Sequence, residues 1–272
     1  VTGVQTCALP ILPVEKLTIG HRRLWATYRT TIESYAFAPY IRTTREQKLA
    51  AYKKLRTETN KVVSYLVKEF ELRKNAEQLK RASTAKTGDL NMSKIYSYGF
   101  NEDIFKKITV MPNGKSHGLV MYIDWSGSMS THLANTMKQL LSLTLFCKKV
   151  NIPFEVYAFS NLSFEITELG MKKSDERGQY FKKEWEDIFK TKDLVLRPFG
   201  LMNLLSSRMT ANEFTYAASE LWNISGGGTG QRTATPGWMM LGSTPLNEAI
   251  IAAMSMVPAF QKKHKLQIVN TV

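Results

Sequence analysis

Short apolar runs and a longer amphipathic stretch alternate in the second half of the chain. Residues 119–123 are a continuous apolar run, which is typical of a strand buried on both faces of a parallel sheet, and residues 154–159 predict a second strand. Between them, residues 131–150 carry apolar side chains at three- and four-residue steps, which predicts a helix. Strand, helix and strand at this spacing predict a βαβ unit and therefore an α/β fold with a mostly parallel sheet.

The rest of this half predicts further elements of such a fold. Residues 210–222 predict a helix that begins with Thr210 and Glu213 at capping-box spacing. The other expectations are a strand at 108–111 followed by a turn at 112–115, an edge strand at 164–168, an amphipathic helix at 179–189, a short helical turn at 201–205, a flexible Gly-rich loop at 225–230, a helix at 245–258 and a strand at 265–272. The Gly-rich loop lacks the Gly-Lys-Ser/Thr ending of a phosphate-binding loop.

The first half is predominantly helical in pattern. Residues 44–82 show the most regular helical spacing, with Thr44 and Gln47 placed for a capping box and a break expected near 57–60. Small polar residues from 82 onward predict a loop followed by a short helix or turn. We therefore expect a helical N-terminal extension over residues 12–107 and an α/β domain over residues 108–272. Residues 1–11 resemble translated cloning or adapter sequence and are excluded from the fold prediction.

Charge is unevenly distributed between these two parts. The net charge is +14, and residues 12–118 carry 21 Lys and Arg against 10 Asp and Glu, whereas residues 119–272 carry 16 against 13. The basic N-terminal region favours an acidic protein or a nucleic acid as partner, or is simply a solvated helix face.

The cysteine content and the hydropathy of the chain indicate in which cellular compartment the protein is expected. Of the two cysteines, Cys7 lies in the excluded stretch, and Cys147 lies on the apolar face of a predicted helix, where we expect it to be buried. No disulfide framework and no run approaching 18 apolar residues is present, so we expect a cytoplasmic protein that does not span a membrane.

Three side chains with oxygen ligands follow the strand at 119–123 directly. Asp124, Ser126 and Ser128 lie at every second position of the loop that leaves its carboxyl end. In open α/β sheets, ligands bind in the crevice beyond the carboxyl ends of the strands. One carboxylate and two hydroxyls there are hard ligands suited to Mg²⁺ or Mn²⁺. The alternative is structural: Asp124 ends the strand, and the serines form the turn and cap the next helix.

This motif, Asp124-x-Ser126-x-Ser128 after an apolar strand, resembles the metal-ion-dependent adhesion site (MIDAS) of von Willebrand factor A domains. In that family a threonine from a separate loop joins the same metal, and Gly242-Ser243-Thr244-Pro245-Leu246 resembles its usual setting. The resemblance implies a Rossmann-like, doubly wound sheet and a role for Thr244 as a further metal ligand. Thr244 alone also fits a simple helix cap, with Pro245 at the first helical position.

A last MIDAS contact is expected to be missing. In A domains the strand that corresponds to 265–272 ends in an aspartate that supplies this contact, and the sequence stops before such a residue. We therefore expect a fragment whose A domain is truncated at the C-terminus.

A narrower resemblance covers roughly residues 65–272. The stretch from Arg81 to Leu90 ahead of the strand, together with the Gly-Ser-Thr-Pro-Leu-Asn-Glu-Ala loop at 242–249, resembles the CobT-type subunit of cobaltochelatase and its phage-encoded relatives. The resemblance implies a non-catalytic subunit that docks onto a hexameric AAA+ ATPase, which donates an acidic residue to the metal. In cobaltochelatase that pair drives cobalt insertion into a corrin ring by a third subunit, a substrate that phage relatives need not share.

Two other function classes remain open at the level of sequence. A metal-dependent hydrolase or peptidase would need a base or nucleophile, and His117, His132 and His264 are single histidines without ligand spacing or a His-Glu-x-x-His motif. A nucleic-acid-binding phage protein would use the basic N-terminal region with Tyr65, Tyr96 and Tyr98, and its binding would depend steeply on salt but not on Mg²⁺.

Overall fold

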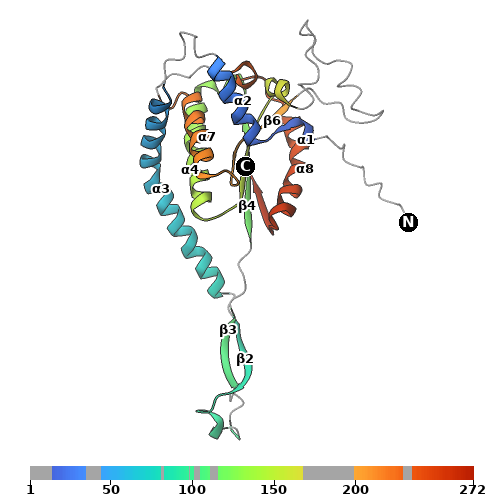
Figure 1. The fold of residues 1–272 in the computed structure, drawn as a ribbon. Helices are drawn as coiled ribbons and strands as arrows, with labels where there is room; N and C mark the ends of the chain where they lie inside the picture. Colours follow the sequence, from blue (N-terminus) through green and yellow to red (C-terminus); the bar gives the residue numbers. More distant parts are fainter. Residues whose placement is uncertain are drawn as a thin grey trace, which may run out of the picture.

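A five-stranded sheet forms the centre of the fold in a computed structural model that describes residues 14–34, 44–80, 83–97, 99–100, 105–110, 116–167, 199–228 and 235–272. The strand order is β1-β6-β5-β4-β7 (Figure 1). β4 pairs in parallel with β5 and with β7, β1 pairs in parallel with β6, and β5 and β6 are antiparallel. The strands are β1 (Thr18–Ile19), β4 (His117–Asp124), β5 (Phe154–Ser160), β6 (Gly200–Ser206) and β7 (Ile268–Thr271).

The predicted βαβ unit is confirmed. β4 and β5 contain the two predicted strands, and α4 (Leu133–Lys149) connects them. The predicted strand at 265–272 is confirmed over the residues of β7. The mostly parallel α/β architecture inferred from these patterns is therefore present.

Helices cover both faces of the sheet (Figure 1). On one face α2 (His21–Ser34), α3 (Arg45–Lys80), α4 and α7 (Ala211–Ile224) share a core with the sheet, and on the other α1 (Val14–Leu17) and α8 (Leu246–His264) do so. The alternation along β4 explains the two cores. Val120 belongs to the second core, whereas Met121 and Ile123 belong to the first; successive side chains of a strand point to opposite faces.

The N-terminal segments contribute to the first core as well. β1 pairs with β6 at the edge of the sheet, and Trp25 of α2 donates its indole N–H to the carbonyl of Leu204 in β6 over 2.9 Å. Tyr52 and Leu55 of α3 are buried in the same core. The segment expected as a helical extension is therefore packed together with the sheet.

α3 is one continuous helix of 36 residues. The Thr44–Gln47 capping box is confirmed, with both reciprocal hydrogen bonds present. The break expected near 57–60 is wrong. Thr59 lies on the buried face of the helix with Leu55 and Val63, and the packing of this face keeps the helix continuous. The Thr59 hydroxyl donates to the carbonyl of Leu55 over 2.9 Å.

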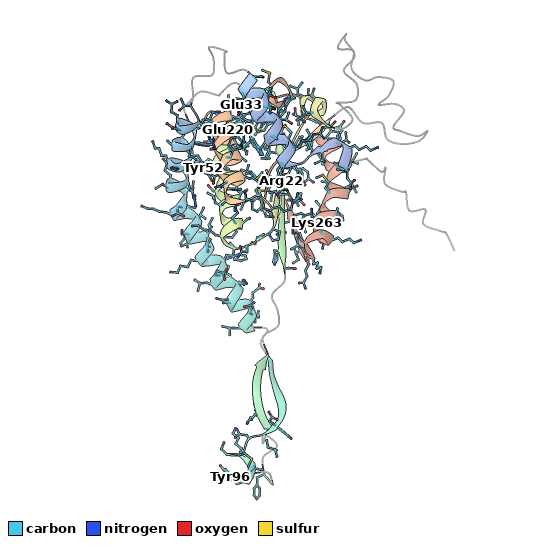
Figure 2. The ribbon with its side chains drawn as sticks, viewed as in Figure 1. Arg22, Glu33, Tyr52, Tyr96, Glu220 and Lys263 are labelled. Atoms are coloured by element: carbon cyan, nitrogen blue, oxygen red, sulfur yellow. The ribbon has the colours of Figure 1, made fainter. Side chains whose placement is uncertain are left out.

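A buried ion pair joins α3 to α7. Lys48 Nζ lies 2.6 Å from Glu220 Oε2, and both side chains are less than a tenth exposed. The hydroxyl of Tyr28 in α2 donates to the same carboxylate oxygen over 3.1 Å. Figure 2 labels Glu220 where α7 faces α3.

A β-hairpin follows α3 and projects away from the sheet (Figure 1). Its strands are β2 (Ser83–Leu90) and β3 (Phe105–Val110), and a short 3₁₀ helix (Ile95–Ser97) lies at its far end, where Figure 2 labels Tyr96. The loop expected from residue 82 onward is wrong, because its polar residues pair with β3 in an antiparallel ladder. The strand expected at 108–111 lies within β3 up to Val110.

Three further predictions of secondary structure are wrong. The helical turn expected at 201–205 is β6, a strand buried along its whole length. The edge strand expected at 164–168 is a 3₁₀ helix (Leu162–Ile166) up to residue 166, and the structure describes nothing beyond Thr167 there. α8 does not end at Pro258 but continues through it to His264. The helix expected at 179–189 lies outside the described residues, as do residues 1–11.

Other local predictions are confirmed. α7 begins with the Thr210–Glu213 capping box, and residues 225–228 of the predicted loop form a turn after this helix. Cys147 is buried, and burial raises the pKa of its thiol to about 12. Among the described helices, none has the length and apolar character that crossing a membrane requires.

Candidate metal centre

The candidate site lies at the carboxyl edge of the sheet, where β4 ends at Asp124. Asp124 is paired in register with Phe159 of β5, so the loops that follow both strands leave the sheet side by side. A 3₁₀ helix (Gly127–Thr131) then turns the chain towards α4. The motif therefore occupies the crevice position that its sequence context predicts.

Trp125 anchors the loop between the strand and this turn. Its side chain is completely buried, and its indole N–H donates to the carbonyl of Met239 over 2.8 Å. Its backbone N–H donates to the carbonyl of Phe159 over 3.2 Å. The anchor ties the first loop both to β5 and to the chain just before the second loop.

The two loops of the candidate site are joined by backbone hydrogen bonds. The N–H of Gly127 donates to the carbonyl of Gly242 over 2.9 Å, and the N–H of Gly242 donates to the carbonyl of Trp125 over 3.1 Å. Ser126 and Gly242 thus form a parallel bridge between segments that are more than 100 residues apart. This bridge fixes the position of Thr244, two residues beyond Gly242.

The four predicted site residues form two hydrogen-bonded pairs at this edge of the sheet. Ser126 Oγ and Ser128 Oγ are 2.9 Å apart, and the Thr244 hydroxyl lies 3.5 Å from Asp124 Oδ2. Ser126 is buried, whereas Ser128 and Thr244 are exposed. One carboxylate and three hydroxyls, in these two pairs, therefore lie on the two loops that the Ser126–Gly242 bridge joins.

Asp124 carries an unsatisfied oxygen. Its Oδ1 is buried and has no hydrogen-bond partner among the described residues. A buried acceptor without a partner is costly, so such an atom is expected to have a ligand that is a hydrogen-bond donor or a cation. The all-oxygen donor set around it fits a hard cation such as Mg²⁺ or Mn²⁺.

Thr244 does not cap the helix that follows it. α8 begins at Leu246 with Pro245 in the N-cap position, and this residue makes no side-chain cap hydrogen bond. The prediction of Pro245 at the first helical position is therefore wrong by one residue. The Thr244 hydroxyl lies near Asp124 instead, so the interpretation of this threonine as a helix cap is wrong.

The start of α4 also differs from the prediction. The helix begins at Leu133 rather than at residue 131, and its N-cap His132 makes no side-chain cap hydrogen bond. The reason is the 3₁₀ turn, which includes both Ser130 and Thr131 and delays the α-helix to Leu133.

Asn161 is a part of the site that the sequence analysis did not identify. It follows β5, and its Oδ1 accepts a hydrogen bond of 2.7 Å from the N–H of Ser243. It lines an open pocket together with Thr244, Asn247 and Glu248 of the second loop and the start of α8. Its position in the sequence could have indicated this role, because Asn161 directly follows β5, and β5 pairs with β4, the strand that ends at Asp124.

Compared with protein-family models, curated proteins and solved structures, the chain matches none. Support for a metal centre therefore comes from the geometry of the site and from the motif itself.

The described part of the chain contains no metal site of the kind built from several His, Cys, Asp or Glu side chains. There, no three His, Cys, Asp or Glu side chains gather into a group that could hold a metal ion. The candidate centre is of a different kind, because only one of its four side chains belongs to those residue types. His132 is the histidine nearest to the motif in sequence, and it is exposed at the start of α4.

Proposed function

We propose that this chain is a metal-dependent docking module of the von Willebrand factor A type. In this proposal Asp124, Ser126, Ser128 and Thr244 hold Mg²⁺ or Mn²⁺ and a carboxylate of a partner protein completes the site. The observation that carries it is the approach of the Thr244 hydroxyl to within 3.5 Å of Asp124 Oδ2, across 120 residues of sequence. The mostly parallel sheet with helices on both faces, and the motif at its carboxyl edge, support the same proposal.

The charge of the residues explains why this site favours docking. Asp124 is the only anionic side chain of the proposed ligand set, and the three hydroxyls are neutral. A bound divalent ion would therefore retain a net positive charge with which to attract a carboxylate. Asp124 also accepts the hydrogen bond of Thr244, and Ser126 and Ser128 bond to each other, so the protein holds its own ligands in place before any partner arrives.

The partner that we propose is an AAA+ ATPase subunit, in a complex of the cobaltochelatase type or its phage-encoded relatives. This part of the proposal rests on the resemblance of residues 65–272 to the CobT-type subunit. It predicts that an AAA+ ATPase from the same genome binds in the presence of Mg²⁺ and is released by EDTA.

Metal binding is tested by titrating the chain with Mn²⁺ and following it by calorimetry and electron paramagnetic resonance. We expect saturable binding to the wild type and a loss of about 100-fold or more for Asp124→Ala, because the only charged ligand is removed. Ser128→Ala should also weaken binding.

Ser130→Ala is the matched control, since Ser130 lies on the same exposed turn but outside the ligand set, and it should bind Mn²⁺ like the wild type. Circular dichroism should show the fold retained in all variants. Equal affinity in Asp124→Ala and wild type would refute the proposed function.

A further inference from the structure

A second cavity lies at the other end of α4 from the candidate metal centre. It has a volume of about 230 Å³ and is lined by side chains of α3, α4 and α7. α4 has 17 residues, so about 25 Å of helix separates its two ends. The cavity is therefore a separate feature of the molecule, and the proposed docking function makes no use of it.

Three cationic side chains line this cavity, and no carboxylate does so. Arg56 comes from α3, and Lys148 and Lys149 come from the last turn of α4. Among the described residues, none of the three forms an ion pair. Positive charge is thus concentrated in a cavity without a counter-charge from its own walls.

The two lysines contact only neutral groups among the described residues. Lys149 Nζ donates to Asn60 Oδ1 over 2.7 Å and to Ser64 Oγ over 3.1 Å. Lys148 Nζ lies 4.1 Å from the centre of the Phe214 ring. Burial, and then the nearby positive charge of Arg56, lower the pKa of Lys148, which is the expected response to cations without an anion between them.

Helix stability accounts for only part of this cluster. Lysines in the last turn of a helix interact favourably with its C-terminal carbonyls, which explains Lys148 and Lys149 in α4. This interaction does not explain Arg56, which lines the same cavity from α3. The Arg56 guanidinium makes no hydrogen bond to any described residue. Ala211, the first residue of α7, also lines the cavity, so the positive end of that helix adds to the same field.

We propose that this cavity binds the phosphate group of a small phosphorylated molecule, with Arg56 and Lys148 contacting the phosphate oxygens. Arg offers a planar set of donors and Lys a compact charge, and both are common phosphate ligands. The buried ring of Tyr52 and the ring of Phe214 form an apolar wall on which the remainder of the ligand packs. A volume of about 230 Å³ between three helices suits a small molecule better than the extended backbone of a nucleic acid.

Inorganic pyrophosphate is the probe that tests this site, titrated by calorimetry at constant ionic strength in the presence of EDTA, which keeps divalent ions out of the measurement. We expect saturable binding to the full chain. Arg56→Gln should weaken it about tenfold or more, because a charged hydrogen bond is lost. Arg56 is exposed, so this variant should fold like the wild type.

Lys54→Gln is the matched control, because Lys54 is an exposed cation of the same helix that does not line the cavity. It should bind pyrophosphate as the wild type does, and so should Asp124→Ala, which alters the other end of α4. Lys148→Gln should weaken binding as Arg56→Gln does, with its thermal unfolding measured because Lys148 also packs on Phe214.

Two results would overturn the proposal. One is the absence of saturable binding at millimolar pyrophosphate. The other is an equal loss in Arg56→Gln and Lys54→Gln, which would show only a diffuse attraction to a basic surface. A short single-stranded DNA is titrated in parallel. If the DNA binds more tightly than pyrophosphate, and if Arg56→Gln and Lys54→Gln weaken DNA binding equally, the anion-binding surface is the exposed face of α3 and not the cavity.

Discussion

Gly242 occupies a position where the two loops of the candidate metal centre have no room for a side chain. A Cβ atom there would overlap Asn161 Oδ1 and lie 2.7 Å from the hydroxyl oxygen of Ser160, which is fully buried. Asn161 in turn accepts the hydrogen bond of Ser243, the residue before Thr244. The absence of a side chain at Gly242 therefore allows the second loop to lie against the end of β5.

Gly242→Ala should consequently displace Asn161 and loosen the Thr244 loop. We expect a destabilisation of about 1–3 kcal/mol and a Mn²⁺ affinity lower by about tenfold, measured by urea unfolding and by calorimetry. Gly237→Ala is the control, because a Cβ at Gly237 meets open space, and it should change neither quantity. Unchanged Mn²⁺ affinity in Gly242→Ala would show that the loop position does not matter for the metal.

At this scale the sequence predicted the motif residues but not what holds them. Asp124, Ser126 and Ser128 follow one another at every second position, so their proximity follows from local spacing. Thr244 was identified by resemblance, since its approach to Asp124 depends on a bridge between distant segments. Asn161 was missed because an asparagine after a strand is equally typical of an ordinary turn.

At the scale of elements, the ion pair between Lys48 and Glu220 fixes how α3 packs on α7. Lys48→Met would leave the buried Glu220 carboxylate with only the hydroxyl of Tyr28, and we expect it to lower the free energy of unfolding by roughly 3–5 kcal/mol. Adding Glu220→Gln removes the stranded charge and should recover part of this loss. Urea denaturation of both variants checks the expectation.

Lys53→Met serves as the comparison for this pair, because Lys53 is exposed on α3 and should change the stability by no more than about 0.5 kcal/mol. If Lys48→Met were equally mild, the ion pair would contribute little to the packing of the two helices.

Element prediction from sequence succeeded where a periodic pattern was long and failed where the partner strand was distant. α3, α4 and α7 each show several turns of regular spacing. The run at 201–205 is too short to distinguish a helical turn from a strand, and only its pairing with β5 decides. β2 has few apolar residues, and its strand conformation comes from pairing with β3, some 20 residues further along the chain.

At the scale of the whole molecule, the boundary expected between residues 107 and 108 does not separate two cores. Trp25, Tyr28, Tyr52 and Leu55 are buried with residues of β4, β5 and β6. Removing residues before 108 would expose the surfaces that these side chains cover, at roughly 1.5–3 kcal/mol for each. That sum is comparable to the entire stability of a typical domain, about 5–15 kcal/mol.

A chain of residues 108–272 should therefore fail to fold, whereas residues 12–272 should unfold in a single cooperative transition. Circular dichroism during heating, together with size-exclusion chromatography, distinguishes the two outcomes. A soluble 108–272 monomer that melts sharply, close to the longer chain, would show instead that the α/β part is an independent domain.

The pairing of β1 with β6 has a consequence for synthesis of the protein. Thr18 is in register with Leu201, so the first strand emerges from the ribosome about 180 residues before its partner. At typical translation rates this interval lasts roughly 10–35 s. During it Ile19 of β1, and Leu17 of α1 beside it, which are both buried in the finished fold, lack the strand with which β1 pairs.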